Sequence, residues 1–222
     1  MTISPAGKTP EPLDRAAVVR TFGLLLVLVA LVLGLAGCAQ TPGRSCADEA
    51  SYFPAGLFPS QYPASDELRR RRYAAPLQRL GEPSLACAPA EAAESYRLLW
   101  LNNLAHPVVI RVSADGEGAT LADAQLSGWG WAEPGEPLAR SLQRLTTEDW
   151  QRLRKALQRA DFWHLPTSGT LYGVHGGQWV IEGQRGGHYH LVDRWSPAAG
   201  EFRELGELFF DLAGWLRPEP GQ

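Results

Sequence analysis

The sequence predicts an α+β domain in which an antiparallel sheet of about five to six strands is backed on one face by two helices. Short runs rich in β-branched and aromatic residues, bounded by turn residues, recur from Ser95 onward. One run with helical periodicity follows the first four of them, and a second closes the chain. The resulting order, β-β-β-β-α-β-β-α, is typical of an antiparallel sheet with helices on one side.

Six runs are predicted as strands. They are residues 95–101, 107–113, 120–126, 138–145, 178–184 and 188–195. The last two form a hairpin around Arg185-Gly186-Gly187. In the final strand, alternation places Tyr189, Leu191 and Asp193 on one side of the sheet and His188, His190 and Val192 on the other.

Two amphipathic helices are predicted. The first begins at Thr146, which has capping-box spacing to Asp149, and it ends near Asp161 because Pro166 prevents it from resuming. The second helix covers about residues 201–216, with an apolar stripe at helical spacing.

Residues 38–94 are predicted to form an irregular, Pro-rich tether. Seven prolines between positions 42 and 89 argue against long helices. One short helix is predicted at residues 65–74, and it contains the run Arg69-Arg70-Arg71-Arg72. This run either faces anionic lipid headgroups or forms a solvated helix face offset by Asp66 and Glu67, and we favour the second interpretation.

The stretch Leu35-Ala36-Gly37-Cys38 closes an apolar run over residues 22–36. That run is shorter than the ~20 residues of a membrane-spanning helix, which favours a signal peptide over an uncleaved anchor helix. The pattern resembles the lipobox of bacterial lipoproteins, in which Cys38 would carry fatty acyl chains such as palmitate. The resemblance divides the chain into a signal peptide (1–37), a lipidated tether (38–94), the α+β domain (95–217) and a tail (218–222).

The resemblance also implies a place in the cell. Two or three acyl chains anchor a protein stably to a membrane, whereas one chain does so only marginally. Ala39 follows the cysteine, and in such lipoproteins the lack of an aspartate at this position favours the outer membrane, with the domain facing the periplasm. The whole chain carries a formal charge of −3, which offers no basic field for nucleic acid.

Lipidation of Cys38 would leave two cysteines, Cys46 and Cys87, in an oxidising compartment. We expect them to form a disulfide rather than remain as separate thiols. The bridge would close a loop of ~40 residues, which the chain-entropy model values at ~4 kcal/mol.

Catalytic and metal-binding chemistry has little support. His188 and His190 point to the same side of one strand, with His175 nearby, and Glu182 or His164 could complete a metal site. No known ligand motif joins these residues, so we expect no metal and no cofactor. The chain also lacks a G-x-S-x-G elbow, an H-E-x-x-H motif and a P-loop, and we therefore expect a protein that is not an enzyme.

Four residues are candidates for contact with a partner. Trp129 and Trp131 lie in a turn-rich segment, where indoles either bind a protein or glycan or fold back onto the sheet. Arg194 and Trp195 follow Asp193 at the end of the last strand, and they form either a strand-end ion pair with a core indole or an exposed anchor.

Residues 95–216 resemble a group of uncharacterised lipoproteins of Gram-negative bacteria. The likeness is carried by residues 94–97, 160–166, 177–179 and 189–197, and it implies no activity. Over roughly the last third of the chain, the order of helix, FWHLP segment, hairpin and helix is similar to emfourin-type inhibitors of metallopeptidases. We therefore expect an outer-membrane lipoprotein that binds another envelope protein or component, with a periplasmic protease inhibitor as the alternative.

Overall fold

The computed structural model describes residues 52–58, 62–115, 117–129, 133–169, 173 and 176–219. All of them belong to one compact unit, Arg44–Gln222. The predicted signal peptide lies outside the described residues, as do Leu35, Ala36, Gly37, Cys38, Cys46, Trp131 and His175.

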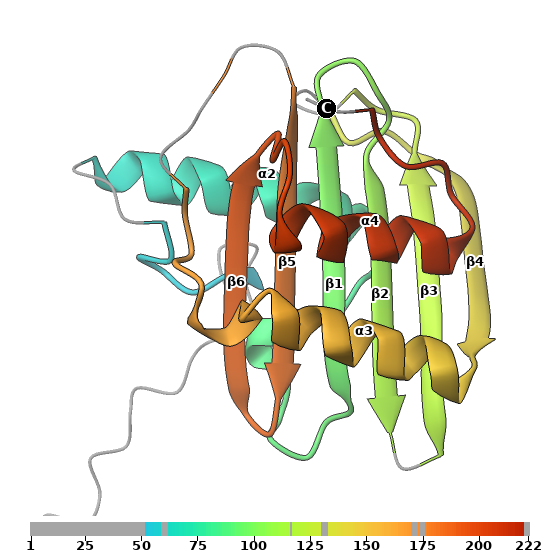
Figure 1. The fold of residues 1–222 in the computed structure, drawn as a ribbon. Helices are drawn as coiled ribbons and strands as arrows, with labels where there is room; N and C mark the ends of the chain where they lie inside the picture. The colour runs from blue at the N-terminus through green and yellow to red at the C-terminus, as the bar shows by residue number, and fades with distance from the viewer. Residues whose placement is uncertain are drawn as a thin grey trace, which may run out of the picture. The chain divides into compact units, whose positions relative to one another are not determined.

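A single antiparallel sheet of six strands forms the centre of this unit, which confirms the predicted α+β fold class (Figure 1). Its spatial order is β4-β3-β2-β1-β5-β6. The strands are β1 (Glu94–Asn102), β2 (Val108–Asp115), β3 (Gly118–Leu126), β4 (Pro137–Leu145), β5 (Gly177–Arg185) and β6 (His188–Trp195). The hairpin between β5 and β6 turns at Gly186 and Gly187, whose φ angles of 56° and 79° suit the twist of the strands.

Two helices cover one face of the sheet, as the sequence predicts (Figure 1). Helix α3 (Thr147–Arg159) begins where Thr146 accepts a hydrogen bond from the backbone N–H of Asp149, at 3.0 Å. Helix α4 (Glu201–Ala213) lies beside it, and both helices pack on the larger apolar core. A short 3₁₀ turn, η3 (Phe162–His164), follows α3 and inserts the buried ring of Phe162.

The opposite face of the sheet is covered by a layer that the sequence interpretation assigned to the tether. Helix α2 (Pro63–Leu80) is longer than the predicted helix at 65–74. Together with residues 52–58 it closes a second apolar core, which contains Phe53, Phe58 and Leu77. The tether prediction for 38–94 is therefore wrong from residue 52 onward, because this segment has a buried apolar face of its own.

Helix α2 continues through Pro76, contrary to the rule that we applied. An interior proline removes one hydrogen bond and costs about 3 kcal/mol. Tyr73, Ala74, Leu77 and Leu80 recur at helical spacing and are all buried against the sheet. Burial of large side chains contributes about 1.5–3 kcal/mol each, which is enough to offset the proline.

The arginine run of α2 is largely paired within the protein. Arg70 and Arg71 form ion pairs with Asp66 and Glu67, one helical turn earlier, as the solvated-face interpretation requires. Asp66 also accepts hydrogen bonds from the backbone of Gly56 and Phe58, at 2.9 Å each. Arg70 is buried, so part of the run holds residues 56–58 on the helix and is not a solvated face.

A buried charge network connects this second layer to the sheet. Arg97 on β1 is completely buried, and its guanidinium donates to Glu182 of β5 at 2.6 and 2.8 Å. The same group contacts Glu82 after α2, at 3.2 Å, and Glu82 also accepts from Arg111 of β2. Tyr189 of β6 donates to the second oxygen of Glu182, which leaves both of its carboxylate oxygens bonded.

Within the part of the chain that the structure describes, no helix combines the length and the apolar composition needed to cross a membrane.

Candidate functional site

The candidate site is one end of the sheet, where two loops meet. The β1–β2 loop (103–107) and the β3–β4 loop (127–136) lie at the same end, because β1 and β3 run parallel to each other on either side of β2. The backbone N–H of Leu126 donates to the carbonyl of Pro107 at 3.1 Å and joins the two loops. We call this region the loop end.

The β3–β4 loop is closed at its base by a neck of hydrogen bonds. Ser127 donates its N–H to the carbonyl of Glu136 at 2.7 Å, and its hydroxyl accepts from the N–H of Glu136. Gly128 donates to the carbonyl of Pro134 at 3.0 Å. A side chain at Gly128 would overlap the backbone of Glu133, so the neck needs glycine at this position.

Trp129 leaves this neck and faces solvent. Its side chain is 57 % exposed, and its ring lies against the imidazole of His106, with the centroids 5.1 Å apart. His106 is itself hydrogen-bonded through Nδ1 to the carbonyl of Gly128, at 2.9 Å. The indole is thus held by the opposite loop and is not folded into the core, which answers the alternative left open by the sequence.

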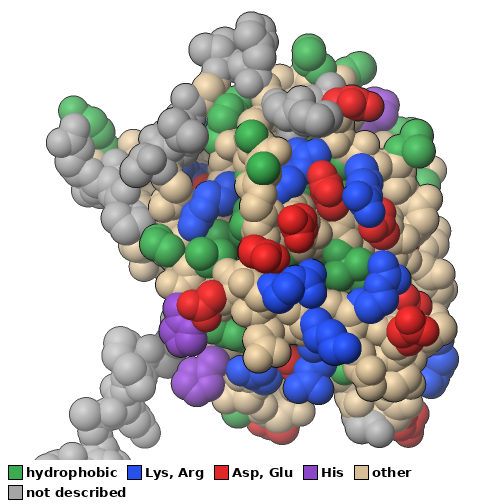
Figure 2. Space-filling view, in the orientation of Figure 1, with side chains coloured by type: hydrophobic (Ala, Val, Ile, Leu, Met, Phe, Trp, Pro, Cys, Tyr) green, Lys and Arg blue, Asp and Glu red, His purple; other side chains and the backbone are tan. Residues whose placement is uncertain are grey.

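Other apolar side chains at the loop end are exposed as well. Leu104 on the β1–β2 loop is 75 % exposed, and Leu138 at the start of β4 is 56 % exposed. Figure 2 shows hydrophobic side chains at this upper end, whereas acidic and basic side chains intermingle over α3 and α4 below it. Exposed apolar side chains gathered at one end of a domain are typical of a protein-binding surface.

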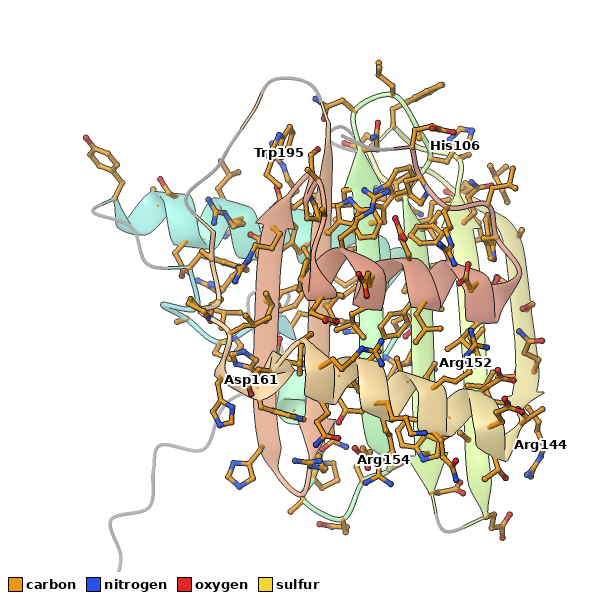
Figure 3. All side chains as sticks on the ribbon, in the orientation of Figure 1. His106, Arg144, Arg152, Arg154, Asp161 and Trp195 are labelled. Carbon is orange, nitrogen blue, oxygen red and sulfur yellow. The ribbon has the colours of Figure 1, made fainter. Side chains whose placement is uncertain are left out.

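Arg194 and Trp195, the other predicted contact residues, lie on the far edge of the sheet. Trp195 ends β6 at the same end of the sheet as the two loops, in register with Gln178 of β5. β6 and β4 are the two edge strands, so Trp195 lies at the other side of this end, and Figure 3 shows Trp195 and His106 well apart. Arg194 donates to the carbonyls of Pro166 and Thr167 at 2.7 and 3.2 Å. The structure thus gives Arg194 a role in attaching residues 166–169 to the end of β6, and its contact with a partner stays a prediction.

Of the histidines that we considered as metal ligands, His190 does not meet Glu182, and His164 is hydrogen-bonded through Nδ1 to the carboxylate of Asp161, at 2.6 Å. His190 packs between Phe162 and the carbonyl of Leu165, on the α3 face. Glu182 lies on the α2 face, where Arg97 and Tyr189 bind it. Among the described residues no group of three or more potential ligands is close enough to hold a metal ion.

A hollow of about 520 Å³ lies at the end of the sheet opposite the loop end, between α3, η3 and the start of β1. It is lined in part by Tyr96, Trp163, Arg154, Lys155 and Arg185. The hydroxyl of Tyr96 donates to Glu94 at 2.7 Å, and burial raises the pKa of Tyr96 above its usual value. This phenol stays protonated at neutral pH and cannot act as a base there.

No family model, no curated protein and no solved structure matches this chain. The resemblances to Gram-negative lipoproteins and to emfourin-type inhibitors therefore stay predictions.

The sequence interpretation found Trp129 but missed the residues around it. Leu104 and Leu138 are single apolar residues beside turns, and only strand pairing brings their loops to one end. No sequence motif marked His106, because a histidine that packs against a tryptophan can lie at any distance from it along the chain.

Proposed function

We propose that this chain is a lipid-anchored lipoprotein of the cell envelope whose α+β domain binds another envelope protein through the loop end. The observation that carries the binding role is the exposed indole of Trp129, held in place by His106 and by a loop closed at its neck. A rigid aromatic side chain costs little conformational entropy when it is buried by a partner.

Lipidation at Cys38 would keep this surface close to the membrane. Residues 52–58 and helix α2 pack on the sheet, so a spacer would lie within the chain between Cys38 and Tyr52. Fully extended, that spacer would span at most about 50 Å. The domain would then search for partners in a thin layer beside the bilayer.

A binding role also suits the polar groups of the domain. The buried charges Arg97, Glu182 and Asp193 are each held by partners from other segments, as in a structural network. The phenol of Tyr96 is kept protonated. Neither arrangement offers the activated base or nucleophile that catalysis needs.

The anchor is tested by metabolic labelling with an alkyne-bearing fatty acid in a Gram-negative host. We expect label on the full chain and none on the Cys38→Ala variant, whereas a Cys87→Ala variant keeps it. If the full chain carries no label, or if the Cys38→Ala variant is still labelled, the proposed lipid anchor at Cys38 is wrong.

The binding role is tested by placing a photo-crosslinking amino acid at Trp129 or Leu104 in living cells. The matched control is Leu68, which is 61 % exposed in the first half of α2, next to Arg69 on the β6 side of the sheet. We expect positions 129 and 104 to capture the same envelope protein and position 68 to miss it. Strong inhibition of a thermolysin-like peptidase by the purified protein would favour the inhibitor alternative instead.

A further inference from the structure

Strand β4 is an edge strand, and the face that it turns away from α3 and α4 is open. In the described part of the chain it pairs with β3 alone, and eight of its nine residues are exposed. Leu142 in its middle is 76 % exposed. The register of β4 with β3 shifts only at the start of β4, between Gln125 and Leu126 of β3. A long edge strand with exposed apolar side chains is a template for pairing, and soluble proteins normally protect such strands.

The two faces of β4 differ. Gln143 and Ser141 point toward the helices, because Gln143 donates to the carbonyl of Leu212 in α4 and Ser141 donates to Asp123. Arg140 lies opposite Ala124, which belongs to the core under α2. The side chains in register with Arg140 therefore point to the α2 side. There α2 reaches the residue before β4 through the ion pair of Arg79 with Glu136, at 3.1 Å, and Arg140, Leu142 and Arg144 remain exposed.

On that open face arginine and leucine alternate. The series is Leu138, Arg140, Leu142 and Arg144. No carboxylate among the described residues is within ion-pair distance of Arg140 or Arg144. Figure 3 shows the Arg144 side chain projecting past the outer edge of the sheet.

Charge decides which occupant suits this edge. Two β4 strands paired antiparallel over their whole length would place four arginines on one sheet face, with no carboxylate from either strand. Like charges on neighbouring strands destabilise a sheet, whereas opposite charges contribute favourably. The edge therefore disfavours a second copy of this chain and suits an acidic strand.

We infer that β4 takes up an extended, acidic segment of a partner protein as a seventh strand, with carboxylates facing Arg140 and Arg144 and apolar side chains facing Leu138 and Leu142. The backbone of β4 supplies the affinity and its alternating face supplies the selectivity. This inference rests on the proposed function, since β4 follows directly from the loop that carries Trp129. One partner could contact both.

The test uses the full chain in detergent and a synthetic peptide as long as β4, with valine and glutamate alternating. Hydrogen–deuterium exchange is followed residue by residue. We expect the acidic peptide to slow exchange at alternate amides of β4 by at least about tenfold. The same peptide with lysine in place of glutamate should leave these amides unchanged.

Charge reversal gives a matched pair of variants. Arg140→Glu combined with Arg144→Glu should weaken the acidic peptide by about tenfold and allow the lysine peptide to bind. Arg152→Glu combined with Arg154→Glu reverses the charge of two exposed arginines on α3 (Figure 3). This control should change the binding of neither the acidic peptide nor the lysine peptide.

Unchanged β4 exchange at millimolar acidic peptide would overturn the inference. Equal protection by both peptides would do the same, as would concentration-dependent protection without peptide, which signals pairing between copies. Trp129→Ala separates this inference from the proposed function. If Arg140→Glu with Arg144→Glu leaves cellular crosslinking intact while Trp129→Ala abolishes crosslinking, the inference about the β4 edge fails and the proposed function stands. If the acidic peptide binds β4 but no envelope protein is captured in cells, the proposed function fails and the inference about the β4 edge stands.

Discussion

Tyr73 of α2 donates a hydrogen bond to the carboxylate of Asp193 in β6, at 2.9 Å, across 120 residues of sequence. Arg69 lies 3.5 Å from the same oxygen, and Gln178 of β5 donates to the other one. These contacts join the N-terminal layer to the last strand of the sheet. They make Asp193 the best single reporter of whether that layer is in place.

The pH dependence of stability should report on Asp193. Burial raises the pKa of Asp193 to about 6, although Tyr73, Arg69 and Arg194 act to lower it. The unfolded chain releases this proton near the ordinary pKa of an aspartate, 3.8, so between these two pH values the folded state binds more protons. Its contribution to stability is therefore fully present below pH ~4 and is lost as pH rises through ~6, by about 3 kcal/mol.

Urea unfolding of the wild type and of Asp193→Asn checks this sign. The free energy of unfolding of the wild type, relative to that of the variant, should fall between pH ~4 and ~7. Glu91→Gln, at an exposed position, should leave the wild-type slope unchanged. A difference between wild type and Asp193→Asn that stays constant with pH would contradict the raised pKa.

Tyr73→Phe should destabilise the protein by about 1.5–3 kcal/mol at neutral pH, because it removes a hydrogen bond to a buried carboxylate. The loss should shrink at pH ~4, where Asp193 is protonated and the bond is no longer charge-assisted. Tyr189→Phe, which removes a hydrogen bond to Glu182, serves as the comparison for the loss at neutral pH.

Leu77→Ala tests whether α2 belongs to the core. The side chain is fully buried in the second core, so its truncation should cost about 2–5 kcal/mol of unfolding free energy. Leu68→Ala on the exposed side of the same helix should stay within about 0.5 kcal/mol of the wild type. Equal, small effects would restore the tether interpretation of this segment.

Arg97→Ala should cost about 3–5 kcal/mol, since it leaves Glu182 buried without its cation. Arg140→Ala, an exposed arginine on β4, provides the comparison and should have little effect. Both values come from denaturant unfolding of the purified variants. If Arg97→Ala leaves the free energy of unfolding unchanged, the charge network contributes no net stability.

The disulfide between Cys46 and Cys87 stays a prediction. Cys87 ends the 3₁₀ turn η2 (Leu85–Cys87), and Cys46 lies outside the described residues. Alkylation without reductant followed by mass spectrometry should leave both residues unmodified and yield a linked peptide pair. Modification of both thiols under these conditions would exclude the bridge.

The sheet and the two helices on its α3–α4 face could be predicted from the sequence. Their signals are local: alternation and turn residues define β1 and β6, and the Thr146 cap defines the start of α3. Trp129 was recognisable for the same reason, since its glycine-rich surroundings mark a loop.

The packing of residues 52–58 and of α2, and the positions of the exposed surfaces, could not be predicted from the sequence, because they depend on contacts between distant segments. Local rules end a helix at Pro76, but burial of Tyr73 and Leu77 against the sheet outweighs that rule. The support of Trp129 by His106, the remoteness of Trp195 and the open edge of β4 depend on the order of strands in space. Strand order is set by packing between segments distant in sequence, and no short window of residues encodes it.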